Sequence, residues 1–144
     1  MHFPMFIDLR DKKILVVGGG TIAQRRIAVL LSFGAKVTIV APETQTVPKG
    51  ALYLPRPYET GDLEGAFFCV AATDKREVNH QVYLDAKAAG IPASIADCRE
   101  ECSFFFPAVC RGENLVAGVV SDGTDHHKTA RAAKAIRSAL EEVK

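Results

Sequence analysis

The segment 18–23 reads GGGTIA and contains the spacing G-x-G-x-x-A, which occurs where a strand turns into a dinucleotide-binding helix. In this spacing Gly18 allows the tight turn, and Gly20 lets the backbone approach a pyrophosphate closely. Ala23, at the third small position, lets the helix pack closely against the strand. A glycine turn without a ligand is the alternative interpretation. The position of the segment between a strand pattern and a helix pattern favours a dinucleotide site.

Backbone N–H groups at the start of the following helix would complete this phosphate site. The amides of Thr21, Ile22 and Ala23 have no acceptor within the helix. The helix dipole adds an attraction for anions of about 0.3–1 kcal/mol. We therefore expect these three residues to bind the cofactor.

A carboxylate is expected about 20 residues after the glycine turn, where it hydrogen-bonds the adenosine ribose. Glu43 is the nearby candidate, and it lies a little beyond the usual end of the strand. No arginine follows before Arg56 that could receive a 2′-phosphate. The sequence therefore favours NAD over NADP. Glu43 as a solvated loop residue is also an open interpretation.

The elements that must position these residues alternate between strand and helix over the first hundred residues. Short apolar runs predict strands at 13–17, 36–40, 51–54, 66–71 and 91–96. A helix is predicted over 21–33, closed by Gly34, and a second helix ends at Gly90. Asp74 with Glu77 resembles a capping box for the second helix, which runs through Ala89. Residues 1–100 therefore predict an α/β class fold, a Rossmann-type doubly wound parallel sheet.

Beyond residue 100 the alternation of strand and helix stops. Residues 103–109 and 115–120 flank the tetrapeptide RGEN, whose composition suits a hairpin turn, and they predict two antiparallel strands. Thr124 would cap a last helix. Four apolar positions of that helix share one stripe: Ala133, Ile136, Leu140 and Val143. Residues 101–144 therefore predict a small α+β segment, a hairpin followed by a helix.

Length and composition limit the classes of function. The chain has 144 residues, enough for one compact domain, and 48% of them are hydrophobic, which excludes a disordered class. Its 18 basic and 17 acidic residues are too balanced for a protein whose main partner is nucleic acid. No apolar run approaches a membrane span, and the N-terminus does not resemble an export signal. We expect a cytoplasmic protein that binds neither membranes nor nucleic acid.

The chain has four cysteines: Cys69, Cys98, Cys102 and Cys110. In the cytoplasm they should be reduced thiols, so no disulfide is expected. The x₃ spacing of Cys98 and Cys102 differs from the C-x₂-C pair that is usual at zinc sites. His126 and His127 fit polar residues at a helix start better than iron ligands. We expect no metal site.

Blocks of sequence around and beyond the glycine turn form a combination more specific than the turn alone. They are FIDL at 6–9, KILVVGGGTIAQRR at 13–26, VAP at 40–42, AATD at 71–74 with Asn79, Asp97, CSF at 102–104, PA at 107–108, and RG at 111–112 before LVAGVVS at 115–121. With these blocks the chain resembles the precorrin-2 dehydrogenase family, the N-terminal module of sirohaem synthases, over almost its whole length.

The resemblance implies NAD-dependent oxidation of precorrin-2 to sirohydrochlorin, on the route to sirohaem and in some organisms to cobalamin or haem. Many members also insert ferrous iron. It implies that Asp97, after the fifth strand, is the catalytic residue, either as a base or as a stabiliser of charge on the pyrrole nitrogens. A turn or cap aspartate is the alternative. It further implies that Ser121 lines the tetrapyrrole site and that Ala72 and Thr73 bind the cofactor.

Two other functions fit the same sequence. One is a non-catalytic NAD-sensing module that regulates a partner. The other is a chelatase subunit in which the nucleotide-binding half is a relic.

A macrocycle with eight carboxylates should be bound by cationic side chains, because the planar arginine fork pairs bidentately with carboxylates. The predicted substrate-binding arginines are Arg25, Arg26, Arg111 and Arg131, with Arg99 and Lys128 as further candidates. Arg25 and Arg26 also fit a solvated face of the first helix.

Three features differ from the family's common pattern. Ser94 stands where an asparagine is frequent, three residues before Asp97. The segment 122–126, DGTDH, replaces a run of Gly-Thr-Ser-Pro type. We also expect that the C-terminal helical domain of many members is absent, since the sequence stops at Lys144.

The aromatic run Phe104-Phe105-Phe106 indicates an assembly. Alternation along a strand would send Phe105 opposite to its neighbours, so one hairpin face would remain apolar and uncovered. A second copy related by a two-fold axis would cover it. The resemblance also implies a homodimer through the hairpin and last helix. We expect Phe105 or the Ile136 and Leu140 stripe in the interface, and Ser121 and Arg131 near the substrate.

Overall fold

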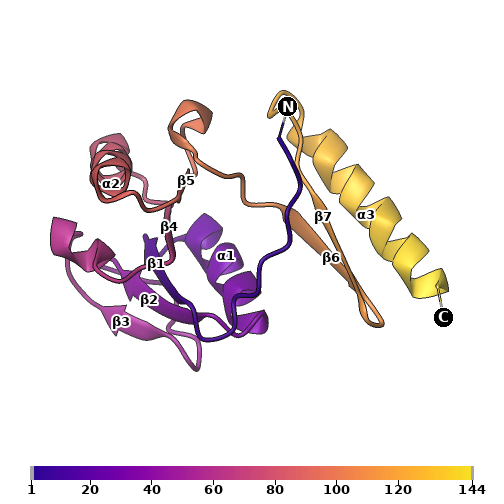
Figure 1. Cartoon of the computed structure of the whole chain (residues 1–144), viewed down its shortest axis with the longest axis horizontal. Helices are drawn as coiled ribbons and strands as arrows, with labels where there is room; N and C mark the ends of the chain where they lie inside the picture. The colour runs from indigo at the N-terminus through magenta and orange to yellow at the C-terminus, as the bar shows by residue number, and fades with distance from the viewer. Residues whose placement is uncertain (1, 144) are drawn as a thin grey trace. The chain divides into compact units, whose positions relative to one another are not determined.

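The structure, a computed structural model, describes residues 2–143. It comprises two compact units: Ile7–Phe104 forms one, and the described residues on either side of that range form the other (Figure 1). Each unit is described by itself. Among residues 2–143 we find no helix whose length and apolar character would let it cross a bilayer.

The first unit is built on five parallel strands. In chain order its main elements are β1 (Lys13–Val17), α1 (Thr21–Ser32), β2 (Lys36–Val40), β3 (Leu52–Leu54), β4 (Phe68–Ala71), α2 (Arg76–Ala89) and β5 (Ala93–Ile95). The strands lie in the order β3-β2-β1-β4-β5, and every neighbouring pair is parallel. The predicted doubly wound fold is confirmed.

Alternation along the strands supplies two buried faces. Leu15 and Val17 of β1 pack in one cluster with Val82 and Ala86 of α2. The intervening Ile14 and Val16 point to the opposite face of the sheet and are also buried. The strands therefore lie between two packed layers, which explains why their sequences are continuously apolar.

The ends of these elements differ in part from the prediction. Gly34 has the left-handed φ of +80° that was expected after α1. The predicted capping box of Asp74 and Glu77 is wrong: α2 begins at Arg76, after Lys75, without a side-chain cap. A capping box occurs instead around the 3₁₀ helix η1 (Thr60–Leu63). Strands β3, β4 and β5 are each shorter than predicted: they span Leu52–Leu54, Phe68–Ala71 and Ala93–Ile95.

The second unit contains the antiparallel pair β6 (Ala108–Gly112) and β7 (Leu115–Val119), followed by α3 (His126–Glu142). Helix α3 packs on the face of β6 that carries the buried Cys110, whose thiol donates a hydrogen bond to the carbonyl of Ala133 at 3.3 Å. The predicted hairpin and last helix are therefore present.

Two expectations about the second unit are wrong. The first strand begins at Ala108 and not at Ser103, so the aromatic run 104–106 lies outside the hairpin and strand alternation does not govern it. Phe104 stacks on Phe68 instead, with 4.8 Å between ring centroids, and Phe105 stacks on His2 at 3.9 Å. The helix cap is not Thr124: the carboxylate of Asp125 accepts from the Lys128 amide at 2.9 Å.

The apolar stripe of α3 is partly covered within its own unit. Ala133 is buried, and Ile136 and Leu140 are half-buried. A Cβ added at Gly112 of β6 would lie 3.0 Å from the Cβ of Leu140, so the strand packs closely on this helix. Val143 remains 57% exposed.

Candidate cofactor and active site

The carboxyl ends of the parallel strands bring most of the predicted site of the first unit to one edge of the sheet. Val17 pairs with both Val40 and Ala71, and Ala71 pairs with Ile95. The segments that follow these residues are the glycine turn, the loop 41–46, the turn 72–75 and the turn with Asp97. Ligands of open α/β sheets bind at this edge.

The first two glycines of the turn are required by close packing. Gly18 has φ +125°, and a Cβ there would lie 2.3 Å from the carbonyl oxygen of Ala72. A Cβ on Gly19 would lie 2.3 Å from the carbonyl oxygen of Glu43. The turn is therefore in contact with the chain segments that follow β4 and β2.

The third glycine faces open space. A Cβ on Gly20 would meet no other atom within 4 Å. Gly20 is the N-cap of α1, which has no side-chain cap and no acidic residue in its first turn. Thr21 and Ile22 are exposed beside it, and Ala23 is buried against the sheet. This arrangement has the room and the N–H donors that a pyrophosphate requires.

The loop after β2 is attached to the start of α1 by side-chain hydrogen bonds. The Gln24 amide nitrogen donates to the Thr44 hydroxyl at 2.8 Å, and the Thr46 hydroxyl donates back to the Gln24 oxygen at 3.0 Å. Gln45 adds a bond from its side-chain nitrogen to the Thr21 hydroxyl at 3.2 Å. The backbone of Glu43 is thus held at the glycine turn while its side chain is exposed, as a ribose ligand would need to be.

The turn after β4 is held by a buried asparagine. Asn79 is fully buried, and its side-chain oxygen accepts from the Thr73 amide at 3.1 Å and from the Thr73 hydroxyl at 2.7 Å. Its nitrogen donates to the Thr73 carbonyl at 3.1 Å. Ala72 is held by a hydrogen bond from its amide to the Val17 carbonyl at 2.8 Å. Both predicted cofactor contacts therefore lie next to the glycine turn.

Asp97 belongs to a chain of ionic contacts. Its carboxylate lies 2.5 Å from Nη1 of Arg76, and Nη2 of the same arginine donates to Glu101. Glu101 also accepts from Nδ1 of His80 at 2.6 Å. Burial alone would raise the pKa of Glu101, but the hydrogen bonds from His80 and Arg76 hold that pKa below its ordinary value.

The predicted substrate arginines of α1 differ in exposure. Arg25 is exposed. Arg26 is half-buried and reaches β5, where its Nη1 lies 3.5 Å from the hydroxyl of the buried Ser94. Burial lowers the pKa of the Arg26 guanidinium. The serine that replaces the family's frequent asparagine is therefore part of an arginine contact.

The outer edge of β5 is closed by the segment that follows it. The amide of Ala93 donates to the Ser103 hydroxyl at 3.1 Å, and the amide of Ile95 donates to the Cys102 sulfur at 3.2 Å. Edge strands with unpaired backbone groups invite association, and here side chains occupy those groups. All four cysteines are free thiols, and burial raises the pKa of Cys69 to about 12.

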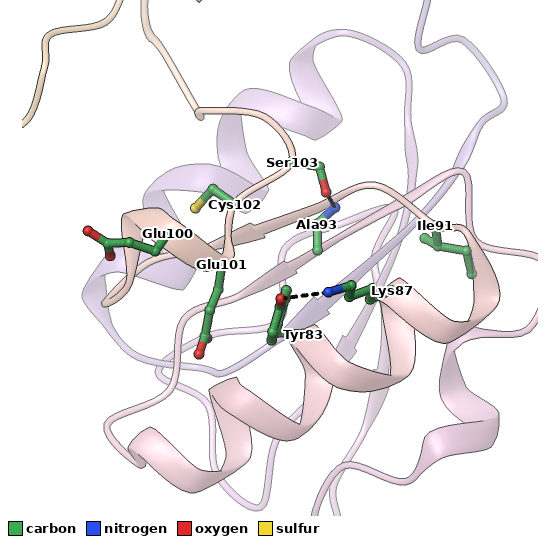
Figure 2. Close-up of a pocket in the computed structure, with 8 residues that line it drawn as sticks. All are labelled: Tyr83, Lys87, Ile91, Ala93, Glu100, Glu101, Cys102 and Ser103. Atoms are coloured by element: carbon green, nitrogen blue, oxygen red, sulfur yellow. Dashed lines mark hydrogen bonds between the residues drawn. The ribbon is translucent and has the colours of Figure 1, made fainter.

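A cavity of about 230 Å³ is lined by this closing segment, by Ala93 of β5 and by residues of α2 (Figure 2). Tyr83 and Lys87 of α2 line it, and the Lys87 ammonium donates to the Tyr83 hydroxyl at 3.4 Å. Glu100 and Glu101 line it from the 3₁₀ helix η2 (Arg99–Glu101). None of the predicted cofactor residues lines this cavity.

Three predicted substrate residues belong to the second unit. Arg111 lies on β6 and Arg131 on α3, both exposed. The Ser121 hydroxyl accepts from the Gly123 amide at 3.2 Å, just after β7. The further candidates are Arg99, in η2 of the first unit, and Lys128, in the first turn of α3. Within residues 2–143 we find no group of three or more side chains arranged to hold a metal ion.

Sequence reasoning assigned no role to several residues that hold the site together: Gln24, Thr44, Gln45, Thr46, Arg76, Asn79, His80 and Glu101. A buried asparagine cannot be distinguished from a surface one by spacing alone. Polar residues directly after the second strand were a usable signal, because that strand ends at the glycine turn.

Comparison with known proteins agrees with this geometry. Residues 5–108 match a family model described as "Putative NAD(P)-binding". The chain belongs to this family. The cofactor prediction is therefore confirmed, and the residues at the turn fit a bound dinucleotide.

Individual proteins are also similar. The chain is 51% identical over 132 residues to the "Probable multifunctional siroheme biosynthesis protein HemA" of Ruminiclostridium josui, covering 88% of this chain and 26% of that protein. It is 39% identical over 127 residues to the "Siroheme synthase" of Methylobacillus flagellatus, covering 84% and 27%. The chain thus spans about a quarter of the length of these relatives.

A solved structure matches nearly the whole chain. "SirC, precorrin-2 dehydrogenase" superposes with a TM-score of 0.79 at 28% identity, covering 98% of this chain and 72% of that one. The resemblance to the precorrin-2 dehydrogenase family is confirmed.

Proposed function

We propose that this chain catalyses the NAD-dependent dehydrogenation of precorrin-2 to sirohydrochlorin, a step in sirohaem formation. The observation that carries the proposal is the position of Asp97. Asp97 follows Ala96, whose amide donates to the Ala71 carbonyl at 2.9 Å, so it lies just beyond the carboxyl end of β5. A carboxylate therefore stands at the sheet edge that holds the glycine turn. The similarity to SirC and to sirohaem synthases supports the substrate.

When bound, NAD supplies the hydride acceptor of this oxidation. The turn 18–20 and the first amides of α1 would hold the phosphates, and Glu43 would hold the ribose of the adenosine half. Ala72, held by the Val17 carbonyl, and Thr73, held by Asn79, would shape the wall of the cofactor site. Asp97 takes up the proton that leaves the substrate with the hydride, or stabilises positive charge on the pyrrole nitrogens.

We further propose that arginines bind the substrate carboxylates. Arg25 and Arg26 would do so from the first unit, and Arg111, Ser121 and Arg131 from the second. The resemblance and the ability of arginine to bind carboxylates bidentately support these assignments. Residues 1–100 would serve as the cofactor-binding domain and residues 101–144 as a dimerisation segment. A cytoplasmic location fits the four free thiols.

An absorbance assay of precorrin-2 conversion tests the proposal, run first with NAD and then with NADP. We expect turnover with NAD, and Asp97→Ala should lower it by about 10²-fold or more without loss of NAD binding. Asp8→Ala, which breaks an exposed ion pair with Arg10 elsewhere, should leave turnover unchanged. NAD binding without turnover would indicate a sensing module, and near wild-type turnover of Asp97→Ala would remove Asp97 from the mechanism.

A further inference from the structure

Arg76 occupies a position that local energetics disfavour. It is the first residue of α2 and follows Lys75, so two cations lie at the positive end of the helix dipole, where Glu77 is the acidic residue of the first turn. The helix has no side-chain cap at this end. The positive charge of Arg76 is paired with two carboxylates of the segment after β5, Asp97 and Glu101. Local rules broken in this way are expected where a residue serves the site.

The contacts of Arg76 are directional. One nitrogen of its guanidinium is paired with Asp97 at 2.5 Å, and the other with Glu101. The guanidinium is planar and rigid, so fixing one carboxylate on it also fixes the direction in which the other is held. A lysine ammonium, as a point charge, would not impose this direction.

One end of this chain of contacts is anchored and the other faces solvent. The Glu101 side chain is 14% exposed, against 36% for Asp97. His80 lies one turn further along α2 than Arg76 and donates to the second oxygen of Glu101 at 2.6 Å. Glu101 is therefore held from two positions on the helix, whereas Asp97 depends on Arg76.

We propose that Arg76 is the positioning residue of Asp97, and that Glu101 and His80 hold Arg76 in place. This inference rests on the proposed function, because the purpose of holding Asp97 is the dehydrogenation. Arg76 acts through Asp97 and does not touch the reacting atoms.

A double-mutant cycle tests the proposal by separating action through Asp97 from independent action. We expect Arg76→Met to lower kcat by about tenfold or more, with the Kd for NAD unchanged, and Arg76→Lys to recover only part of the loss. Asp97→Ala combined with Arg76→Met should be no slower than Asp97→Ala alone. Arg56→Met, which removes the fork paired with Asp62 at 2.6 Å, is the matched control and should retain full kcat.

A second measurement is independent of turnover. With ¹³C-labelled aspartate, the carboxyl resonance of Asp97, assigned from Asp97→Asn, should shift in Arg76→Met and stay in place in Arg56→Met. The proposal is overturned if the Asp97 resonance does not move in Arg76→Met. It is also overturned if the losses of kcat in the double-mutant cycle are additive, or if Arg76→Met has a higher kcat than the wild type. If the resonance shifts but the wild-type chain does not turn over precorrin-2, the proposed function fails, and with it the catalytic purpose of the pair.

Discussion

At the residue scale, Gly20 is a position at which a side chain should affect cofactor binding and not the stability of the fold. A Cβ at Gly20 would meet no other atom of the protein within 4 Å. A Cβ at Gly18 or Gly19 would clash with a backbone carbonyl oxygen. A side chain at Gly20 would therefore be tolerated by the fold and would compete only with a ligand. This is the position at which the backbone has to approach the pyrophosphate.

Gly20→Asp is expected to abolish NAD binding while the unfolding midpoint changes little. The new carboxylate would occupy the phosphate position and repel its charge. Calorimetric titration with NAD measures the loss. Gly61→Asp, at another glycine whose added Cβ would meet nothing within 4 Å, should bind NAD normally. Unchanged affinity in folded Gly20→Asp would show that the phosphates bind elsewhere.

Asn79 holds the turn after β4 through its hydrogen bonds with Thr73. Replacing it by alanine leaves the half-buried Thr73 amide without its acceptor, which costs about 1–3 kcal/mol of unfolding free energy. We expect Asn79→Ala to lose about that much stability in urea and to bind NAD about tenfold more weakly. Gln81→Ala, on the exposed face of the same helix, is the control. An NAD affinity equal to wild type would contradict a role for this turn at the cofactor.

At the element scale, the 3₁₀ helix η1 is stabilised by an ion pair that depends on pH. Asp62 accepts from both terminal nitrogens of Arg56, at 2.9 and 2.6 Å, and its side chain is 7% exposed. The hydrogen bond from Arg56 holds the pKa of Asp62 below its ordinary value of 3.8, against the opposing effect of burial. The folded state therefore binds this proton less readily than the unfolded state.

Because the pKa of Asp62 is lower in the folded state than in the unfolded state, the free energy of unfolding depends on pH. The pair contributes stability that is fully present above pH 3.8 and is lost as the pH falls through the lower pKa of the folded state. Asp62→Asn should lower the unfolding free energy by about 1 kcal/mol at pH 7, since Arg56 is partly solvated. Urea denaturation at pH 7 and pH 3 should show that the unfolding free energy falls less between these two pH values in the variant than in the wild type. Equal losses would contradict the role of this pair.

At the scale of the whole molecule, the second unit leaves two valines exposed at and just after β7. Val116 lies on the side of β7 opposite to α3, beside Arg111 of β6, and is 42% exposed, while Val120, directly after β7, is 45% exposed. Exposed apolar side chains of this kind are what a second copy of the chain would cover. These valines, and not the alternation of the aromatic run, now support the proposed homodimer.

Light scattering at micromolar concentration should give twice the chain mass of 15.6 kDa. Val116→Glu is expected to shift the mass toward that of one chain, because the charge would be buried in the interface. Leu84→Glu alters an exposed leucine of α2 and should leave the dimer intact. A wild-type mass near 15.6 kDa would exclude the homodimer.

The sequence by itself determined the order of the elements, the parallel sheet and the position of the glycine turn. These features depend on local patterns: apolar runs, helical spacing and the consecutive glycines of the turn 18–20. The cofactor class followed from the same few residues, because backbone amides and glycines do the binding. Asp97 and Ser121 as site residues came from the resemblance and not from spacing.

Only the tertiary structure decided which polar side chains pair. The contacts of Thr73 with Asn79, of Gln24 with Thr44, and of Arg76 with Asp97 and Glu101 join separate elements. The misassigned caps at Asp74 and Thr124 arose in the same way, because several polar residues near a helix start can serve and packing selects among them. A buried hydrogen bond is decided by the three-dimensional position of both partners, which the order of residues along the chain does not specify.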